Sequence, residues 1–79
     1  MSQPVVAVYP GTFDPITLGH QDIIRRAADL FGTVLVAVAA AHHKKTLFSL
    51  DERLETVREV LQPYSNVRVE AFTGLVRDF

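Results

Sequence analysis

The sequence predicts an α/β protein built on a doubly wound parallel sheet, here in the order β-α-β-α-β. Two short apolar runs rich in valine predict buried strands, and two intervening segments space their apolar residues as amphipathic helices do. A third strand-like segment alternates apolar and charged residues. Strands that alternate with helices pair in parallel, and their crossovers are right-handed.

The first half of the chain predicts a strand, a loop and a helix. The strand is expected at residues 5–9, a β-branched apolar run that a Pro-Gly pair ends. Residues 10–18 follow as a loop rich in Gly, Pro, Thr and Asp. The helix is expected to begin at residue 19 or 20 and to stop at Gly32. Its predicted apolar stripe comprises Ile23, Ala27 and Phe31, with Ile24 and Leu30 beside it.

The next elements repeat this order. A strand is expected at residues 33–40 and a loop at residues 41–48. Ser49 and Glu52 form a capping-box pattern that begins a helix, and Pro63 ends it. The charged residues between positions 51 and 59 are expected to form a solvated face. The predicted inward face comprises Leu50, Leu54, Val57 and Leu61.

The third strand, residues 67–71, is expected at an edge of the sheet because one of its faces is charged. The predicted spatial order of the strands is therefore 3-2-1. Two right-handed crossovers in one direction place both helices on one face and leave an apolar face bare. Residues 73–79 predict a turn and the start of another helix. We therefore interpret residues 1–79 as the N-terminal half of a single larger domain.

Composition argues against several functional classes. The chain has 8 Lys+Arg and 9 Asp+Glu, a net charge of −1, whereas nucleic-acid binding requires a basic surface. It has no cysteine, which excludes disulfides and favours a cytoplasmic location. The longest apolar run, residues 34–41, is far too short to cross a bilayer. We expect neither a nucleic-acid nor a membrane partner.

The residues that can carry chemistry lie in the loop after the first strand, which reads GTFDPITLGH from Gly11 to His20. Ligands of open α/β sheets bind at the carboxyl ends of the strands, and a helix N-terminus favours an anion. Glycines let the backbone approach a ligand, while Thr12, Thr17 and His20 offer donors. Asp14 is expected to staple the loop. The spacing predicts a phosphate-binding strand-loop-helix unit.

The motif Gly-Thr-Phe-Asp-Pro-x-Thr-x-Gly-His resembles the signature of the nucleotidyltransferase superfamily. With Thr17 at the first motif position, it is most similar to the phosphopantetheine adenylyltransferase family. Agreement continues at Lys44-Lys45, at residues 48–53 and at residues 67–76. The resemblance covers nearly the whole chain but about half of the family's usual length, and it implies a Rossmann-like fold.

The resemblance implies an enzyme that transfers an adenylyl group reversibly from ATP to 4′-phosphopantetheine. The products would be dephospho-coenzyme A and pyrophosphate, a step of coenzyme A biosynthesis. The family resemblance also implies Mg²⁺ bound with the ATP, a cytoplasmic location and a homo-oligomer, a hexamer in this family. No metal ligand from the protein is implied.

The resemblance also assigns roles by motif position. His20 would bind ATP and stabilise the transition state. Thr12 would contact both substrates, and the backbone of Phe13 would contact ATP. Lys44 and Val76 would bind the pantetheine substrate. Further candidates are Thr17 and Lys45.

Three alternatives stay open. A half domain would bind phosphate or nucleotide without turnover, or it would serve as an assembly fragment that associates through its bare face. A related nucleotidyltransferase, acting on nicotinate mononucleotide or a glycerol phosphate, is the third, although those families prefer histidine where Thr17 stands.

His42-His43 replaces the turn that the family often has before its lysines, and without a third ligand it is not expected to bind a metal.

Overall fold

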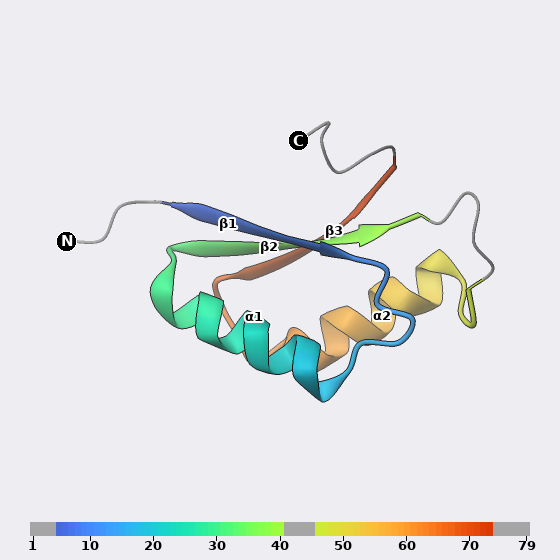
Figure 1. The fold of residues 1–79 in the computed structure, drawn as a ribbon, viewed down its shortest axis with the longest axis horizontal. Coiled ribbons are helices and arrows are strands. Elements are labelled where there is room, and N and C mark those ends of the chain that lie inside the picture. The colour runs from blue at the N-terminus through green and yellow to red at the C-terminus, as the bar shows by residue number, and fades with distance from the viewer. Residues whose placement is uncertain (1–4, 41–45, 74–79) are drawn as a thin grey trace.

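The computed structural model describes residues 5–40 and 46–73. Its elements follow the predicted order: β1 (Val6–Gly11), α1 (Leu18–Leu30), β2 (Thr33–Ala39), α2 (Leu50–Leu61) and β3 (Val67–Phe72). The strands form a parallel sheet in the order β1-β2-β3, which confirms the predicted order 3-2-1. Both helices lie on one face of this sheet (Figure 1).

The core lies between β2 and the two helices. Every second residue of β2 faces the helices, and Val34, Val36 and Val38 are fully buried. Ile24 of α1 and Val57 of α2 close the same cluster and are also fully buried. Burial of such side chains is the main source of stability in a domain of this size.

Neither helix covers the opposite face of the sheet, as predicted (Figure 1). Val8 is paired with Leu35, and Leu35 with Arg68, so these three side chains share the face away from the helices. Val6 and Val8 remain 56% and 44% exposed. The apolar part of this face belongs to β1 and β2, and the charged part belongs to β3.

Several predicted boundaries and one predicted stripe differ from the structure. Strand β1 continues through Pro10 to Gly11, because an edge strand tolerates a residue without an N–H. The strand begins at residue 6 rather than 5. Helix α1 begins at residue 18, β2 ends at residue 39, and β3 extends to residue 72. In α1, Ile23 and Leu30 are 51% and 78% exposed. Helical residues are about 100° apart, so a face centred on Ile24 turns both toward solvent.

The ends of the helices are capped by side chains. Ser49 Oγ accepts from the Glu52 N–H at 3.1 Å, and Glu52 Oε1 accepts from the Ser49 N–H at 2.9 Å, which confirms the predicted capping box of α2. At the C-terminal end of α1, Asn66 Nδ2 donates to the carbonyls of Ala28 and Phe31. No helix in residues 5–40 and 46–73 has the length and apolar composition of a membrane span.

The capping box makes one stability contribution pH-dependent. Its hydrogen bonds with Ser49 hold the pKa of the Glu52 carboxyl below its usual 4.5. A lowered pKa means that Glu52 stabilises the fold above pH 4.5, and this stabilisation disappears as the pH falls through the lowered pKa. We expect the difference in unfolding free energy between wild type and Glu52→Gln, measured by urea titration at a series of pH values, to shrink as the pH falls from 4.5 through the lowered pKa. A difference independent of pH would contradict the ionised cap.

Candidate functional site

The Gly11–His20 loop lies where the sequence predicts it, between the carboxyl end of β1 and the first turn of α1. From the end of β1 the loop runs past the N-terminal end of α2 before it enters α1 (Figure 1). The carboxyl ends of the parallel strands β1 and β2 are adjacent there, because Gly11 pairs with Val38. Ligands of open α/β sheets bind at this edge.

Thr17 and His20 cap α1 with each other. The Thr17 hydroxyl oxygen accepts from the His20 N–H at 3.2 Å, and His20 Nδ1 accepts from the Thr17 N–H at 3.0 Å. A backbone N–H can only donate, so Nδ1 must present its lone pair. In the neutral ring the proton then resides on Nε2. The cap therefore fixes the tautomer in which His20 offers an N–H donor from Nε2, and it makes Thr17 the N-cap of α1.

Phe13 gives the loop a small core of its own. Its side chain is only 3% exposed, and its ring meets the rings of Tyr9 and His20 edge to face, with centroids 5.7 and 4.9 Å away. Its backbone has a φ of 52°, in the left-handed region that few non-glycine residues adopt. Phe13 thus supports one side of the His20 ring, a role that the sequence did not predict.

The two glycines of the motif are explained differently. A Cβ at Gly11 would lie 2.9 Å from Cε2 of the buried Phe13 ring, so the fold itself excludes a side chain there. A Cβ at Gly19 would meet only Thr17 Oγ1, at an ordinary 3.6 Å. Gly19 is exposed and lies inside α1, where glycine is less favourable than alanine by roughly 1 kcal/mol. Its glycine is consistent with the close approach of a ligand.

We expect Gly11→Ala and Gly19→Ala to have opposite effects on stability. Gly11→Ala forces the Phe13 ring to move and should cost about 1–3 kcal/mol, as overpacking does. Gly19→Ala should be neutral or stabilising by up to about 1 kcal/mol. Urea unfolding of both variants checks this pair. Equal destabilisation by the two changes would contradict the difference in space around them.

Asp14 staples the loop, as predicted. Its two carboxylate oxygens accept from the N–H groups of Leu47 and Phe48, at 2.6 and 2.9 Å. The partners lie just before α2, 33 and 34 residues further along the chain. Asp14 therefore joins the loop after β1 to the segment that enters α2.

Arg53 belongs to the same region, and sequence reasoning missed it. The residues between positions 51 and 59 were expected to form a solvated face, yet Arg53 is only 3% exposed. The prediction was wrong for this residue because Arg53 lies three residues after Leu50 and four before Val57, on the inward face of α2. That spacing was the available signal. Its guanidinium donates to the carbonyls of Thr12, Ala39 and Phe48.

The remaining predicted site residues divide into two groups. Thr12, Phe13, Thr17 and His20 lie together in the loop, and Thr12 is partly exposed at the end of β1. Lys44, Lys45, Val76 and the His42-His43 pair lie outside the described residues. Within the described part of the chain, no group of three His, Asp or Glu side chains could hold a metal ion.

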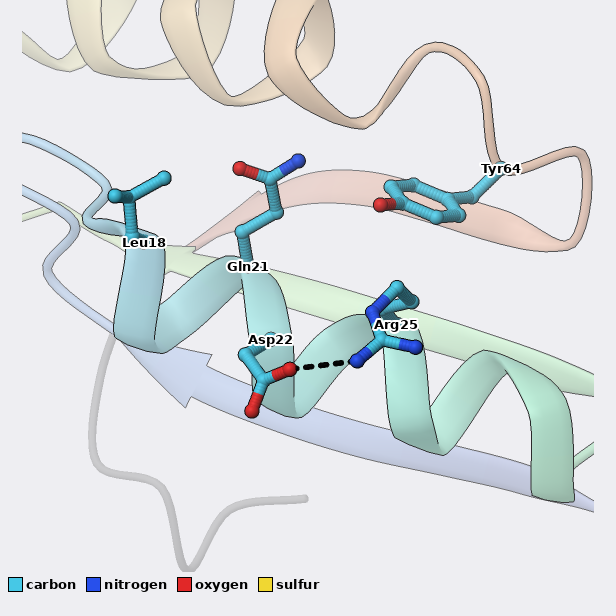
Figure 2. A pocket seen from close by; sticks show the side chains of 5 residues that line it. All are labelled: Leu18, Gln21, Asp22, Arg25 and Tyr64. Carbon is cyan, nitrogen blue, oxygen red and sulfur yellow. Dashed lines mark hydrogen bonds and ion pairs between the residues drawn. The ribbon is translucent and has the colours of Figure 1, made fainter.

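A shallow groove of about 290 Å³ lies elsewhere, between α1 and the segment that follows α2 (Figure 2). Figure 2 shows Tyr64, from the segment after α2, across from Arg25 of α1. Asp22 bridges Arg25 at 2.8 Å and Arg26 at 3.2 Å, and the hydrogen bond from Arg25 lowers the pKa of the Asp22 carboxyl. Exposed ion pairs of this kind contribute little to stability. The groove is lined by Leu18, Gln21, Asp22, Arg25 and Tyr64 and does not include Thr12 or His20.

A parallel sheet whose first strand leads through a glycine- and threonine-bearing loop into a helix N-terminus is typical of nucleotide-binding α/β proteins. The cytidylyltransferase-like family model matches residues 8–79, and the chain belongs to this family.

Within the family, the chain is similar to proteins named phosphopantetheine adenylyltransferase. It is 68% identical to that of Acidovorax sp. (strain JS42) over 95% of this chain and 46% of the relative. It is 60% identical to that of Bordetella avium (strain 197N) over 95% of this chain and 45% of the relative. The chain thus spans about half the length of the curated relatives it matches.

Solved structures show the same fold. The NadR protein in complex with NR superimposes with a TM-score of 0.80 and 28% identity, over 92% of this chain and 21% of that one. The same protein in complex with NAD and AMP-PNP gives a TM-score of 0.79. A bifunctional NMN adenylyltransferase/ADP ribose pyrophosphatase from Francisella tularensis, 22% identical over 91% of this chain and 23% of that one, has a TM-score of 0.75 and shows the fold alone.

Proposed function

We propose that this chain carries the catalytic loop of an enzyme that transfers the adenylyl group of ATP to 4′-phosphopantetheine. The observation that carries the proposal is the His20 imidazole, whose Nδ1 is held by the Thr17 N–H so that Nε2 is the donor. Sequence identities of 68% and 60% to proteins named phosphopantetheine adenylyltransferase support 4′-phosphopantetheine as the acceptor. The complex of NadR with AMP-PNP, an ATP analogue, supports an adenine nucleotide as donor.

In the proposed reaction a phosphate oxygen of 4′-phosphopantetheine attacks the α-phosphorus of ATP. A new P–O bond forms as the bond from the α-phosphorus to the bridging oxygen breaks, and pyrophosphate leaves with that electron pair. No covalent intermediate with the enzyme is needed, so the protein acts by positioning and by stabilising charge. His20 Nε2–H donates to the oxygens on which charge accumulates.

The other loop residues serve binding. The positive end of α1 attracts phosphate, the Thr12 hydroxyl contacts both substrates, and the Phe13 backbone contacts ATP. Gly19 leaves room for a phosphate against the first turn of α1. Lys44, with Lys45 beside it, would neutralise the acceptor phosphate, and Val76 would line the pantetheine site.

The proposal extends to the setting of the reaction through family resemblance. Mg²⁺ would bind together with ATP, as part of the nucleotide substrate, and would neutralise phosphate charge. The described residues provide no cluster of three ligands for it, and the Asp14 carboxylate is engaged by two backbone N–H groups. A cytoplasmic location and a hexameric assembly are proposed on the same basis.

Pyrophosphate release from Mg·ATP tests the proposal. We expect release only when 4′-phosphopantetheine is present, with dephospho-coenzyme A formed in equal amount. Nicotinate mononucleotide is the matched alternative acceptor, because the sequence leaves open a related nucleotidyltransferase that acts on it. Release with nicotinate mononucleotide alone would replace the proposed acceptor. No release with either acceptor, together with retained ATP binding, would indicate a binding module.

A further inference from the structure

Arg53 is a cation buried among backbone carbonyls. Only 3% of it is exposed, and no described carboxylate lies within ion-pair distance of it. A buried charge without an opposite charge is unfavourable unless its donors are satisfied, and an apolar side chain of similar volume is often at least as stable. The inward face of α2 offers such apolar neighbours on both sides, at Leu50 and Val57. Stability alone therefore does not account for an arginine here.

The hydrogen bonds of Arg53 reach three separate segments. Nη1 donates to the Thr12 carbonyl after β1 at 2.9 Å and to the Ala39 carbonyl at the end of β2 at 2.7 Å. Nε donates to the Phe48 carbonyl before α2 at 3.2 Å. A guanidinium presents its donors in a rigid planar fork, which an ammonium cannot reproduce. One side chain thus fixes the relative positions of the three segments that border the loop.

Asp14 also joins the loop after β1 to the segment before α2. Phe48 donates its N–H to Asp14 and accepts at its carbonyl from Arg53, so its backbone is held at both polar groups. Asp14 lies two residues after Thr12, whose carbonyl Arg53 also binds. The loop and the entry to α2 are therefore joined by two independent side chains.

We propose that Arg53 is a positioning residue of the adenylyl-transfer site, acting through the Thr12 backbone rather than on substrate. This inference rests on the proposed function. The fork holds the Thr12 carbonyl, and so sets where the Thr12 hydroxyl and the Phe13 N–H lie relative to His20. The shape of the guanidinium, and not its charge alone, is what the site requires.

The kinetic test compares Arg53→Lys and Arg53→Met with wild type in the whole protein. Arg58→Lys is the matched control, because Arg58 is exposed on the same helix and donates to one carbonyl, that of Val69. We expect kcat to fall about 100-fold in both Arg53 variants, the scale of a 1 Å misplacement, with a smaller change in KM for ATP. We expect Arg58→Lys to keep wild-type kcat. Assays at a temperature where each variant is fully folded exclude a loss through unfolding.

A second measurement needs no activity. Hydrogen exchange of the Phe48 N–H reports whether the junction is held, and we expect it to be at least about tenfold faster in Arg53→Met, the factor for one hydrogen bond from a charged group. Exchange at Val36, in the core, should not change. Unchanged Phe48 exchange, or wild-type kcat in folded Arg53→Lys, would overturn the positioning role. If wild type itself releases no pyrophosphate, the proposed function fails, while the exchange result still decides whether Arg53 holds the loop.

Discussion

Replacing His20 with alanine is expected to slow adenylyl transfer by about 100- to 1,000-fold, or about 3 kcal/mol of transition-state stabilisation. The physical reason is the loss of one preorganised donor, Nε2–H, whose direction the Thr17 N–H fixes through Nδ1. The effect should appear in kcat rather than in KM for ATP, because the charge that Nε2–H stabilises grows toward the transition state. Initial rates of pyrophosphate release at varied ATP concentration measure both constants.

The alanine change also removes half of the α1 cap, so it needs a control that separates the two roles. Glutamine at the third position of a helix also accepts from the N-cap N–H in a capping box. We therefore expect His20→Gln to recover the stability lost in His20→Ala, without recovering full turnover. If His20→Ala is folded and turns over at nearly the wild-type rate, the catalytic role of the imidazole is wrong.

The largest expected loss of stability comes from Ile24→Ala. Ile24 is fully buried between α1 and the sheet, so its truncation removes buried methyl groups and leaves a cavity, at a cost of about 2–5 kcal/mol. Ile23→Ala is the matched control, since it makes the same chemical change one residue earlier at a side chain that is 51% exposed. We expect its cost to be well under half that of Ile24→Ala. Urea unfolding of both variants gives the difference in unfolding free energy, provided that both show the same dependence of that free energy on urea concentration.

A result in which the two isoleucine variants lose equal stability would contradict the orientation of α1. The sequence alone placed Ile23 on the apolar stripe and Ile24 beside it, whereas in the structure Ile24 is buried and Ile23 is exposed. Helix periodicity narrows the buried face to roughly a third of the circumference, and only packing decides where that face is centred. Here Ile24 is enclosed by the core cluster, while Ile23 lies about 100° away on the helix.

The arrangement of the sheet could be predicted because a few strong rules determine it. Right-handed crossovers and the charged face of β3 were sufficient for the order 3-2-1 and for the bare apolar face. Capping chemistry is equally local, so Ser49 could be recognised as an N-cap from Glu52, three positions away. These features need no knowledge of distant contacts.

The features that were missed depend on how side chains pack in the folded protein. Phe13 has a left-handed backbone, and its buried ring contacts Tyr9 and His20; no sequence pattern predicts either feature. The three carbonyl partners of Arg53 are up to 41 residues away in the chain. Its position on the inward face of α2 was visible in the sequence, but its charge favoured a solvated interpretation.

The shared cap of Thr17 and His20 has a spectroscopic consequence. Nitrogen-15 chemical shifts of imidazole distinguish an N–H nitrogen from one with a free lone pair, so the ring of His20 reports on the first turn of α1. Chemical shifts that place the lone pair on Nδ1 and the proton on Nε2 would indicate that the first turn of α1 is formed. If that turn frayed, the two neutral tautomers of the imidazole would interconvert, and the chemical shifts of its two nitrogens would be averaged. One side chain thus offers a probe of local order, without any attached dye or tag, at the point where chemistry is proposed to occur.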